Sequence, residues 1–227
     1  MNANKKLFRA PGLHRLSMVE LLIVIALLLF LTPFVEEIKN GELIVSALIS
    51  LVLLSAVLAV ANHPSSLIIA LLLAIPAIAG RWLNHFHPHL MPREIFLLAG
   101  IGLIAFTVFH LLRFVLRAAS VDTEVLCASI SAYLMLGLLW TMAYWLVESL
   151  SPGAFSFNTA TDAKETMEGF NAFYFSFITL CTVGYGDITP VTKIARMLAA
   201  TEAITGLLYV AVLIARLVAL YSRPKSS

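Results

Sequence analysis

The chain has 227 residues, of which 60% are hydrophobic and only 12% are charged. A soluble domain carries about 25% charged residues, so this composition, with a mean hydropathy of +0.94, excludes an ordinary soluble protein. The net charge of +2 is too small to indicate a nucleic-acid partner. The long apolar runs match the roughly 20 residues that a helix needs to cross a bilayer, so we expect membrane-spanning helices rather than barrel strands.

The first apolar run follows Lys5, Lys6, Arg9 and Arg15, a pattern shared with signal peptides. The run is long for a signal peptide and acidic residues follow it, which favours a retained helix. In chain order, the predicted spans are residues 18–35, 43–61, 67–83, 94–112, 124–147 and 192–221. A shorter aromatic segment, 167–181, lies between the last two spans.

Residues 182–187 read Thr-Val-Gly-Tyr-Gly-Asp and directly follow this aromatic segment. A cation that sheds its water needs oxygen ligands in place of its hydration shell, and backbone carbonyls supply them without a full negative charge. Aiming successive carbonyls at one axis needs a backbone whose φ alternates in sign, which Gly184 and Gly186 allow. Non-helical backbone at membrane depth is tolerated where it lines a cavity. The string therefore predicts a selectivity filter for K⁺.

Residues 125–221 resemble the pore module of the potassium channel family, and the stretch 188–192 with Gly206 resembles its bacterial members. The resemblance implies an outer helix at 124–147, a pore helix at 167–181, the filter at 182–187 and an inner helix at 192–221. It further implies that K⁺ is coordinated by the filter residues Thr182, Val183, Gly184, Tyr185 and Gly186. We expect a homotetramer, because one chain contributes a single filter strand and a ring of carbonyls needs four.

The remaining parts complete an all-α membrane protein with six spans, a re-entrant pore helix and a filter loop. We expect a cytoplasmic N-terminus (1–17), a four-helix transmembrane domain (18–112), a linker (113–123), the pore domain (124–221) and a short cytoplasmic tail (222–227). Lys and Arg are moderately enriched in the loops on the side of the termini. This bias favours cytoplasmic N- and C-termini in the plasma (inner) membrane.

Two residues are predicted to support the filter from outside it. Tyr174 lies where the family places an aromatic residue that can hydrogen-bond Asp187 at the end of the filter; simple packing is the alternative for this aromatic segment. Glu202 is an ionisable group inside a span, which makes it a functional candidate. It lies about 140° around the helix from Leu207, so it points away from a cavity lined by Leu207, Val210 and Ile214. Candidate partners for its carboxyl group are Ser176, Thr179 and Tyr133.

Gly206 lies in the middle of the inner helix. The resemblance implies a gating hinge, and close packing against another helix is the competing explanation.

The four-helix domain lacks the features of a voltage sensor. A sensor needs several Arg or Lys residues at three-residue spacing within the membrane field. Residues 95–109 contain none, and Arg113 and Arg117 lie at the inner end of the span. We therefore expect little or no voltage gating. His85, His87 and His89 alternate in a predicted external loop, where a solvated loop is favoured over a metal or proton sensor.

The sequence thus predicts passive K⁺ conduction by a channel that is not an enzyme, with K⁺ ions in the filter, no other cofactor, and no nucleotide or nucleic-acid partner. The bilayer and other copies of the chain are the expected partners. A weakly selective cation channel, an ion-translocating subunit of a larger transporter and a non-conducting membrane sensor are the alternatives.

Overall fold

The computed structural model describes residues 11–35, 38–39, 41–61, 64–87, 92–158 and 166–221. The predictions for residues 1–10, the tail 222–227 and His89 lie outside this part of the chain. In the described part the elements run in the order α1 (Pro11–Val35), α2 (Gly41–Val60), α3 (Pro64–Phe86), α4 (Arg93–Arg117), α5 (Thr123–Leu150), β1 (Phe155–Phe157), α6 (Gly169–Leu180), β2 (Ile188–Pro190) and α7 (Lys193–Tyr221).

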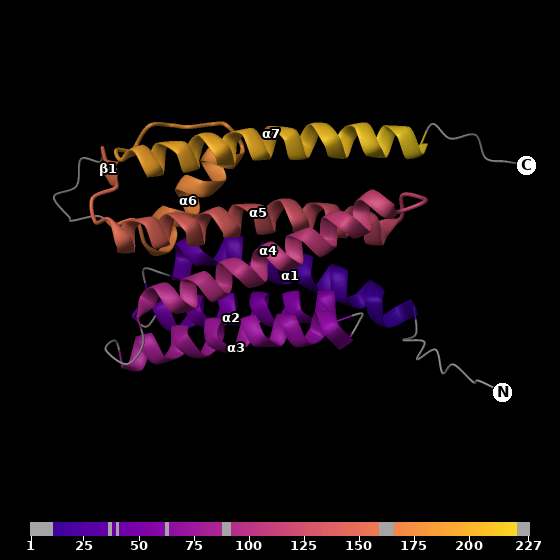
Figure 1. The fold of residues 1–227 in the computed structure, drawn as a ribbon, viewed down its shortest axis with the longest axis horizontal. Helices are drawn as coiled ribbons and strands as arrows, with labels where there is room; N and C mark the ends of the chain where they lie inside the picture. Colours follow the sequence, from indigo (N-terminus) through magenta and orange to yellow (C-terminus); the bar gives the residue numbers. More distant parts are fainter. Residues whose placement is uncertain are drawn as a thin grey trace, which may run out of the picture.

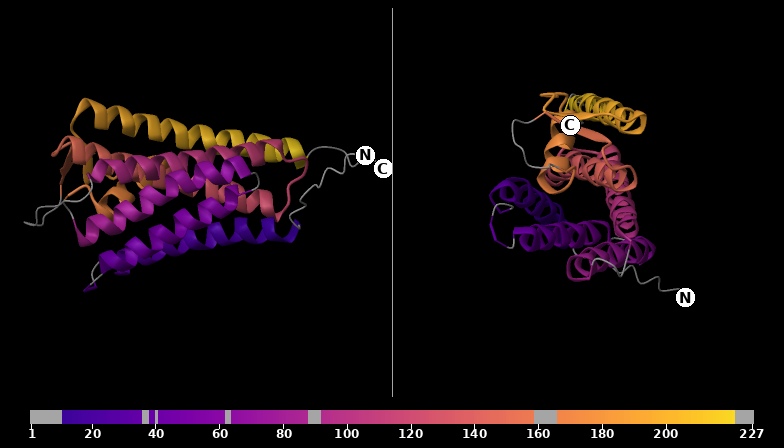
Figure 2. Two further views of the ribbon diagram at one scale, coloured as in Figure 1. Left: turned by 60° about the horizontal axis from the view of Figure 1, so that its bottom comes forward. Right: turned by 90° about the vertical axis from the view of Figure 1, so that its left-hand side faces the viewer.

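The long helices run side by side in two groups (Figures 1 and 2). Helices α1 to α4 form one group, which packs onto α5 through α4 and α1. The short helix α6 lies between α5 and α7 on the other side. Helix α1 begins and α7 ends at the same end of the bundle (Figure 1), as an even number of crossings requires.

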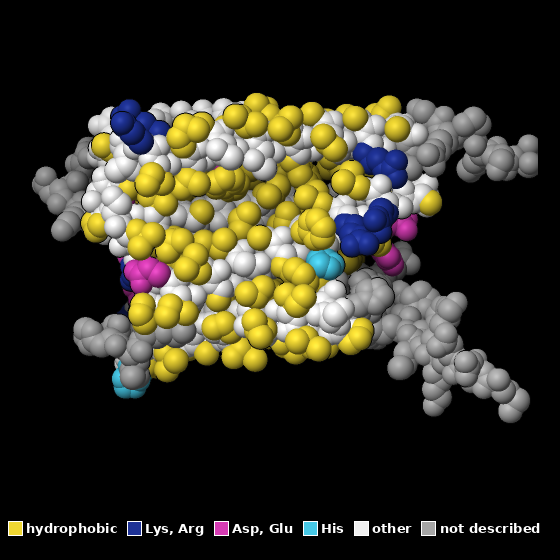
Figure 3. Space-filling view, viewed as in Figure 1, with side chains coloured by type: hydrophobic (Ala, Val, Ile, Leu, Met, Phe, Trp, Pro, Cys, Tyr) yellow, Lys and Arg dark blue, Asp and Glu magenta, His cyan; other side chains and the backbone are white. Residues whose placement is uncertain are grey.

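Six of these helices are long and apolar enough to cross a membrane, which confirms the prediction of six spans with a shorter helix before the last. Charged side chains on the face shown in Figure 3 gather near the two ends of the molecule, with a largely apolar region between them. Helix α3 continues through Pro76 to Phe86. A proline is tolerated in a membrane helix where neighbouring groups satisfy the freed carbonyl.

The core between the two groups follows helical spacing. In α1, Leu21, Ile25 and Leu28 recur at four- and three-residue intervals and are buried. They belong to the same core cluster as Ala128 and Ala132 of α5. Small residues on one helix let another approach closely in a membrane, where van der Waals packing drives helix association.

The predicted linker 113–123 is wrong in its first half, because α4 continues past Leu112 to Arg117. The buried apolar stripe of α4 continues through Leu111 and Val115, which are four residues apart. Burial of Val115 therefore favours a further helical turn beyond Leu112. The connection is shortened to 118–122. Asp122 then caps α5 by accepting a hydrogen bond from the Val125 amide at 2.9 Å.

A two-stranded ribbon that the sequence did not suggest joins the segments on either side of the pore helix. β1 pairs with β2 in antiparallel register, with Ser156 opposite Thr189. Just beyond it, the Asn158 amide donates to the Asp187 carbonyl at 2.7 Å and the Val191 amide to the Ala154 carbonyl at 2.8 Å. The ribbon therefore attaches the segment that follows residue 187 to the segment that follows α5.

Candidate ion-conduction site

Helix α6 is held between α5 and α7 by close contacts on both sides. On the α5 side, a Cβ placed on Gly137 would meet the ring of Phe177 at 2.5 Å, so only glycine leaves room for that ring. The Ser176 hydroxyl lies 2.7 Å from the Gly137 carbonyl oxygen. The helix ends at Leu180, and its carboxyl end, which carries the negative end of the helix dipole, leads directly into residues 181–186.

Residues 181–186 form an exposed, non-helical strip. Three of them, Thr182 (φ 58°), Gly184 (φ 53°) and Gly186 (φ 83°), have positive φ and alternate with Val183 and Tyr185, which do not. Such an alternation is the backbone geometry that lets successive carbonyls face one side of a strip. A positive φ was expected at the two glycines. It was not expected at Thr182, because the threonine side chain makes this backbone conformation costly and no pattern of residue types reveals it.

Both ends of the strip are anchored by hydrogen bonds. At the inner end, the Val183 amide donates to the Ile178 carbonyl at 2.8 Å and the Thr182 amide to the Thr179 carbonyl at 2.9 Å. Just beyond the other end, the Asn158 amide donates to the Asp187 carbonyl at 2.7 Å. The strained conformation is therefore fixed by the surrounding structure.

Tyr174 and Asp187 lie together, with the tyrosine hydroxyl donating to the carboxylate at 2.6 Å. This is the hydrogen bond that the resemblance implies. It also raises the pKa of the Tyr174 phenol to about 12, because loss of the proton would place two negative charges side by side. The hydroxyl therefore remains a donor at physiological pH.

Glu202 of α7 is fully buried and faces α5 and α6. One carboxylate oxygen lies 2.6 Å from the Ser176 hydroxyl, and the other accepts a hydrogen bond from Tyr144. Ser176 was among the candidate partners. The second partner is Tyr144 rather than Tyr133, whose hydroxyl lies 3.5 Å from the Cys181 sulfur.

Tyr144 lies on a face of α5 that helical spacing groups together but does not by itself assign to α6. Gly137, Thr141 and Tyr144 are four and three residues apart, so they lie on one face of α5. This is the face that meets α6, since Gly137 contacts both Ser176 and Phe177.

Gly206 lies against the end of the pore helix. A Cβ at this position would overlap the carbonyl oxygen of Leu180, a backbone atom that cannot rotate away. Helix α7 is continuous through the position. Leu207, Val210 and Ile214, the predicted cavity-lining residues, are all exposed on the single chain, as are other apolar residues of α7 such as Leu208 and Val212.

Of the three histidines, the structure describes His85 and His87. His85 belongs to the last turn of α3 rather than to a loop, and its ring lies 3.9 Å from the Glu42 carboxylate. His87 follows the helix end. Among the residues that the structure describes, no three His, Cys, Asp or Glu side chains group as a metal site.

The pore domain of an ion channel combines four parts: an outer helix, a short helix that stops inside the bundle, a strip whose backbone φ alternates in sign, and an apolar inner helix. Here α5, α6, residues 181–186 and α7 have this arrangement. Residues 132–223 match the family described as "Ion channel". This part of the chain is an ion channel pore domain, and the match confirms the prediction that the chain is not an enzyme.

Two potassium channels are among the similar proteins. The chain is 34% identical over 80 residues to "Two pore potassium channel c" of Oryza sativa subsp. japonica, which covers 35% of this chain and 18% of that protein. It is 31% identical over 96 residues to "Inward rectifier potassium channel Kirbac3.1" of Paramagnetospirillum magnetotacticum, which covers 40% of this chain and 28% of that protein. The matches thus span less than a third of either relative. No solved structure matches the chain significantly.

Proposed function

We propose that the chain forms a K⁺-selective channel that conducts passively through a filter built from residues 182–186. The observation that carries the proposal is the alternation of positive φ at Thr182, Gly184 and Gly186 on an exposed strip. Such a backbone directs its carbonyls to one side, where they can replace the hydration shell of K⁺. The two relatives are potassium channels by name, which supports the same ion.

The proposed assembly is a homotetramer around the filter axis. A single strip offers carbonyls on one side of an ion only, and four strips close the ring. Helix α7 supports this assembly, because only 17% of its membrane span is buried within the chain, compared with 56% for α5. In the tetramer α7 would line the cavity and contact neighbouring copies.

The proposal is tested by ion flux into liposomes that contain the purified protein, with K⁺ or Na⁺ as the permeant ion. We expect K⁺ flux that Ba²⁺ blocks and much smaller Na⁺ flux. Equal fluxes of both ions would replace the proposal with a weakly selective cation channel. No flux from the wild-type protein over a wide range of pH and voltage would contradict it.

A pair of glycine variants distinguishes an effect on the filter from a general effect of backbone strain. Gly186 and Gly153 both have φ of +83°, and a Cβ at either position meets nothing within 4 Å. An alanine therefore costs each site a similar strain of about 1–2 kcal/mol. Gly186→Ala should lower K⁺ flux at least about tenfold, whereas Gly153→Ala, outside the strip, should leave it near wild type. Equal losses in both variants would remove the special role of the strip.

A further inference from the structure

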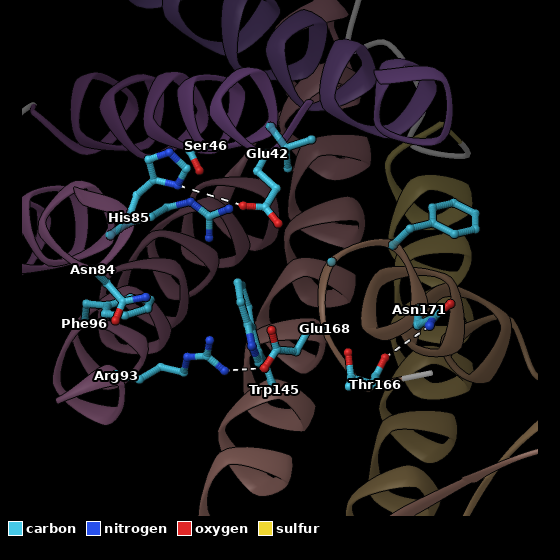
Figure 4. Close-up of a pocket in the computed structure, with 14 residues that line it drawn as sticks. Glu42, Ser46, Asn84, His85, Arg93, Phe96, Trp145, Thr166, Glu168 and Asn171 are labelled. Atoms are coloured by element: carbon cyan, nitrogen blue, oxygen red, sulfur yellow. Dashed lines mark hydrogen bonds and ion pairs between the residues drawn. The ribbon is translucent and has the colours of Figure 1, made fainter. Parts of the chain in front are cut away.

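A polar crevice lies between the four-helix group and the start of the pore helix. It has a cavity volume of about 530 Å³, and residues of α2, α3, α4, α5 and α6 line it. Figure 4 shows Arg93, Asn84 and His85 on one side and Trp145, Glu168 and Asn171 on the other. Glu168 is the N-cap residue of α6, so the crevice borders the helix that leads into the filter.

Two buried hydrogen-bond donors in this crevice have no acceptor among the described residues. They are Nε of Arg81 and Nε1 of Trp145. The two side chains are neighbours, since the Arg81 guanidinium lies 5.3 Å from the centre of the Trp145 ring. A buried donor without an acceptor is unfavourable by about 1–3 kcal/mol. Two such donors at one place indicate that the crevice is built for a group that brings oxygen acceptors.

Arg81 is the arginine of the crevice that forms no ion pair among the described residues. Arg93, whose guanidinium lies 5.8 Å from the Trp145 ring centre, forms an ion pair with Glu168. Glu42 is the carboxylate that acts on Arg81 electrostatically, yet it forms no ion pair with Arg81 among the described residues. Its side chain is 83% exposed and lies 3.9 Å from His85.

We propose that this crevice binds a phosphate oxyanion, with Arg81 as its main ligand and Trp145 as a second donor. Arginine presents several N–H groups in a fixed fork that matches phosphate geometry. Ser46 and Asn84 add a hydroxyl and an amide to the crevice lining. The phosphate comes either from the headgroup of an anionic lipid, since the crevice lies at one end of the spans, or from free phosphate.

A bound phosphate would connect the four-helix group to the pore helix. Arg81 belongs to α3, Trp145 to α5, and Arg93 of α4 holds the N-cap residue of α6. The oxyanion would therefore join elements that meet here, and its binding can be measured without reference to conduction.

The test is a binding titration of the purified, detergent-solubilised protein, followed by native mass spectrometry. One arm adds phosphatidylglycerol, with phosphatidylcholine as the zwitterionic reference, and the other adds inorganic phosphate. Arg81→Gln should weaken binding at least about tenfold, the loss expected for a charge-assisted hydrogen bond. Trp145→Phe, which keeps an aromatic ring and removes only the N–H, should weaken it several-fold. Glu42→Gln should tighten it by removing a competing carboxylate.

Arg113→Gln is the matched control, because Arg113 is an exposed arginine near the opposite end of α4. Binding of phosphatidylglycerol that follows this variant pattern supports a lipid headgroup, and the same pattern with phosphate alone supports a free anion. If Arg81→Gln does not fold, the opposite effects of Trp145→Phe and Glu42→Gln decide the question. Binding of both probes that is unchanged in Trp145→Phe and Glu42→Gln would overturn the inference.

Discussion

Glu202 is a residue through which the inner helix contacts the pore helix, and its removal should be felt at the filter. Glu202→Leu keeps the bulk of the side chain and leaves the Tyr144 hydroxyl without its carboxylate acceptor, whereas the Ser176 hydroxyl keeps the Gly137 carbonyl oxygen at 2.7 Å. The buried Tyr144 hydroxyl without an acceptor should cost about 1–3 kcal/mol of stability. We expect a lower thermal unfolding midpoint and a reduced ratio of K⁺ to Na⁺ flux, measured in detergent and in liposomes respectively.

Two neighbouring variants on α5 show whether this effect belongs to the carboxyl group. Tyr144→Phe removes a single hydrogen bond to Glu202 and should cause a smaller change in the same direction. Thr141 is also buried, but its hydroxyl donates only to the Gly137 carbonyl of its own helix, at 2.8 Å. Thr141→Val should therefore leave the flux ratio unchanged. If Glu202→Leu leaves stability and selectivity at wild-type values, Glu202 does not support the filter.

At the residue scale the sequence identifies the strip well and its support only in part. Residues 182–187 are recognisable because two glycines and a fixed order of side chains are needed for one backbone shape. Glu202 stands out as a carboxyl group in an apolar span. Its partner Tyr144 does not, because α5 contains other polar residues and which face meets α6 depends on the packing of three helices.

At the scale of elements, the contact between α7 and the end of α6 gives Gly206 a packing role. Gly206→Ala would force its Cβ into the Leu180 carbonyl, next to the filter. Overpacking of this kind costs about 1–3 kcal/mol, so K⁺ flux should fall about tenfold or more. A hinge would predict a loss as well, since alanine stiffens the helix.

A double variant distinguishes the two explanations. Ala203→Gly returns a glycine to the same helix one turn away without removing the overlap at position 206. If Gly206 acts by packing, adding Ala203→Gly to Gly206→Ala restores no flux. Recovery of flux in the double variant, measured in the same liposome assay, would instead establish a hinge.

Element boundaries were predicted least accurately where burial, not composition, decides them. The end of α4 contains Arg113 and Arg117, which resemble a polar connector, yet Val115 is buried and keeps this part helical. The ribbon of β1 and β2 was missed because each strand has three residues and its partner lies on the other side of the pore helix. No local pattern predicts a pairing over that distance.

At the scale of the whole molecule, the exposed apolar surface of α7 requires either lipid or further copies of the chain. Its burial of 17% is close to the 22% of α3, which lies at the outer edge of the four-helix group. Helix α7 differs from α3 because the filter strip lies beside it, and a strip facing lipid would leave its carbonyls unsatisfied. We expect a mass of four 24.8 kDa chains by light scattering of the purified protein, corrected for detergent. A stable monomer would contradict the proposed ring of carbonyls.

The four-helix group is connected to the pore but lacks charge where a voltage would act on it. Arg216 of α7 donates to the carbonyl of Ala118, directly after α4, at 2.8 Å, so movement of α4 has a route to the inner helix. Between residues 95 and 109, however, α4 carries no Lys or Arg. Voltage sensors move about three to four charges per subunit.

Recordings in planar bilayers between negative and positive voltages should therefore give a gating charge below about one elementary charge per chain. Neutralising Arg113 and Arg117 together to Gln should not alter this value, because both are exposed near the end of α4. A steep voltage dependence that disappears in the double variant would show that these two arginines move through the field. The contact between Arg216 and Ala118 would then be the mechanical connection of a sensor, and Arg216→Gln should weaken the coupling.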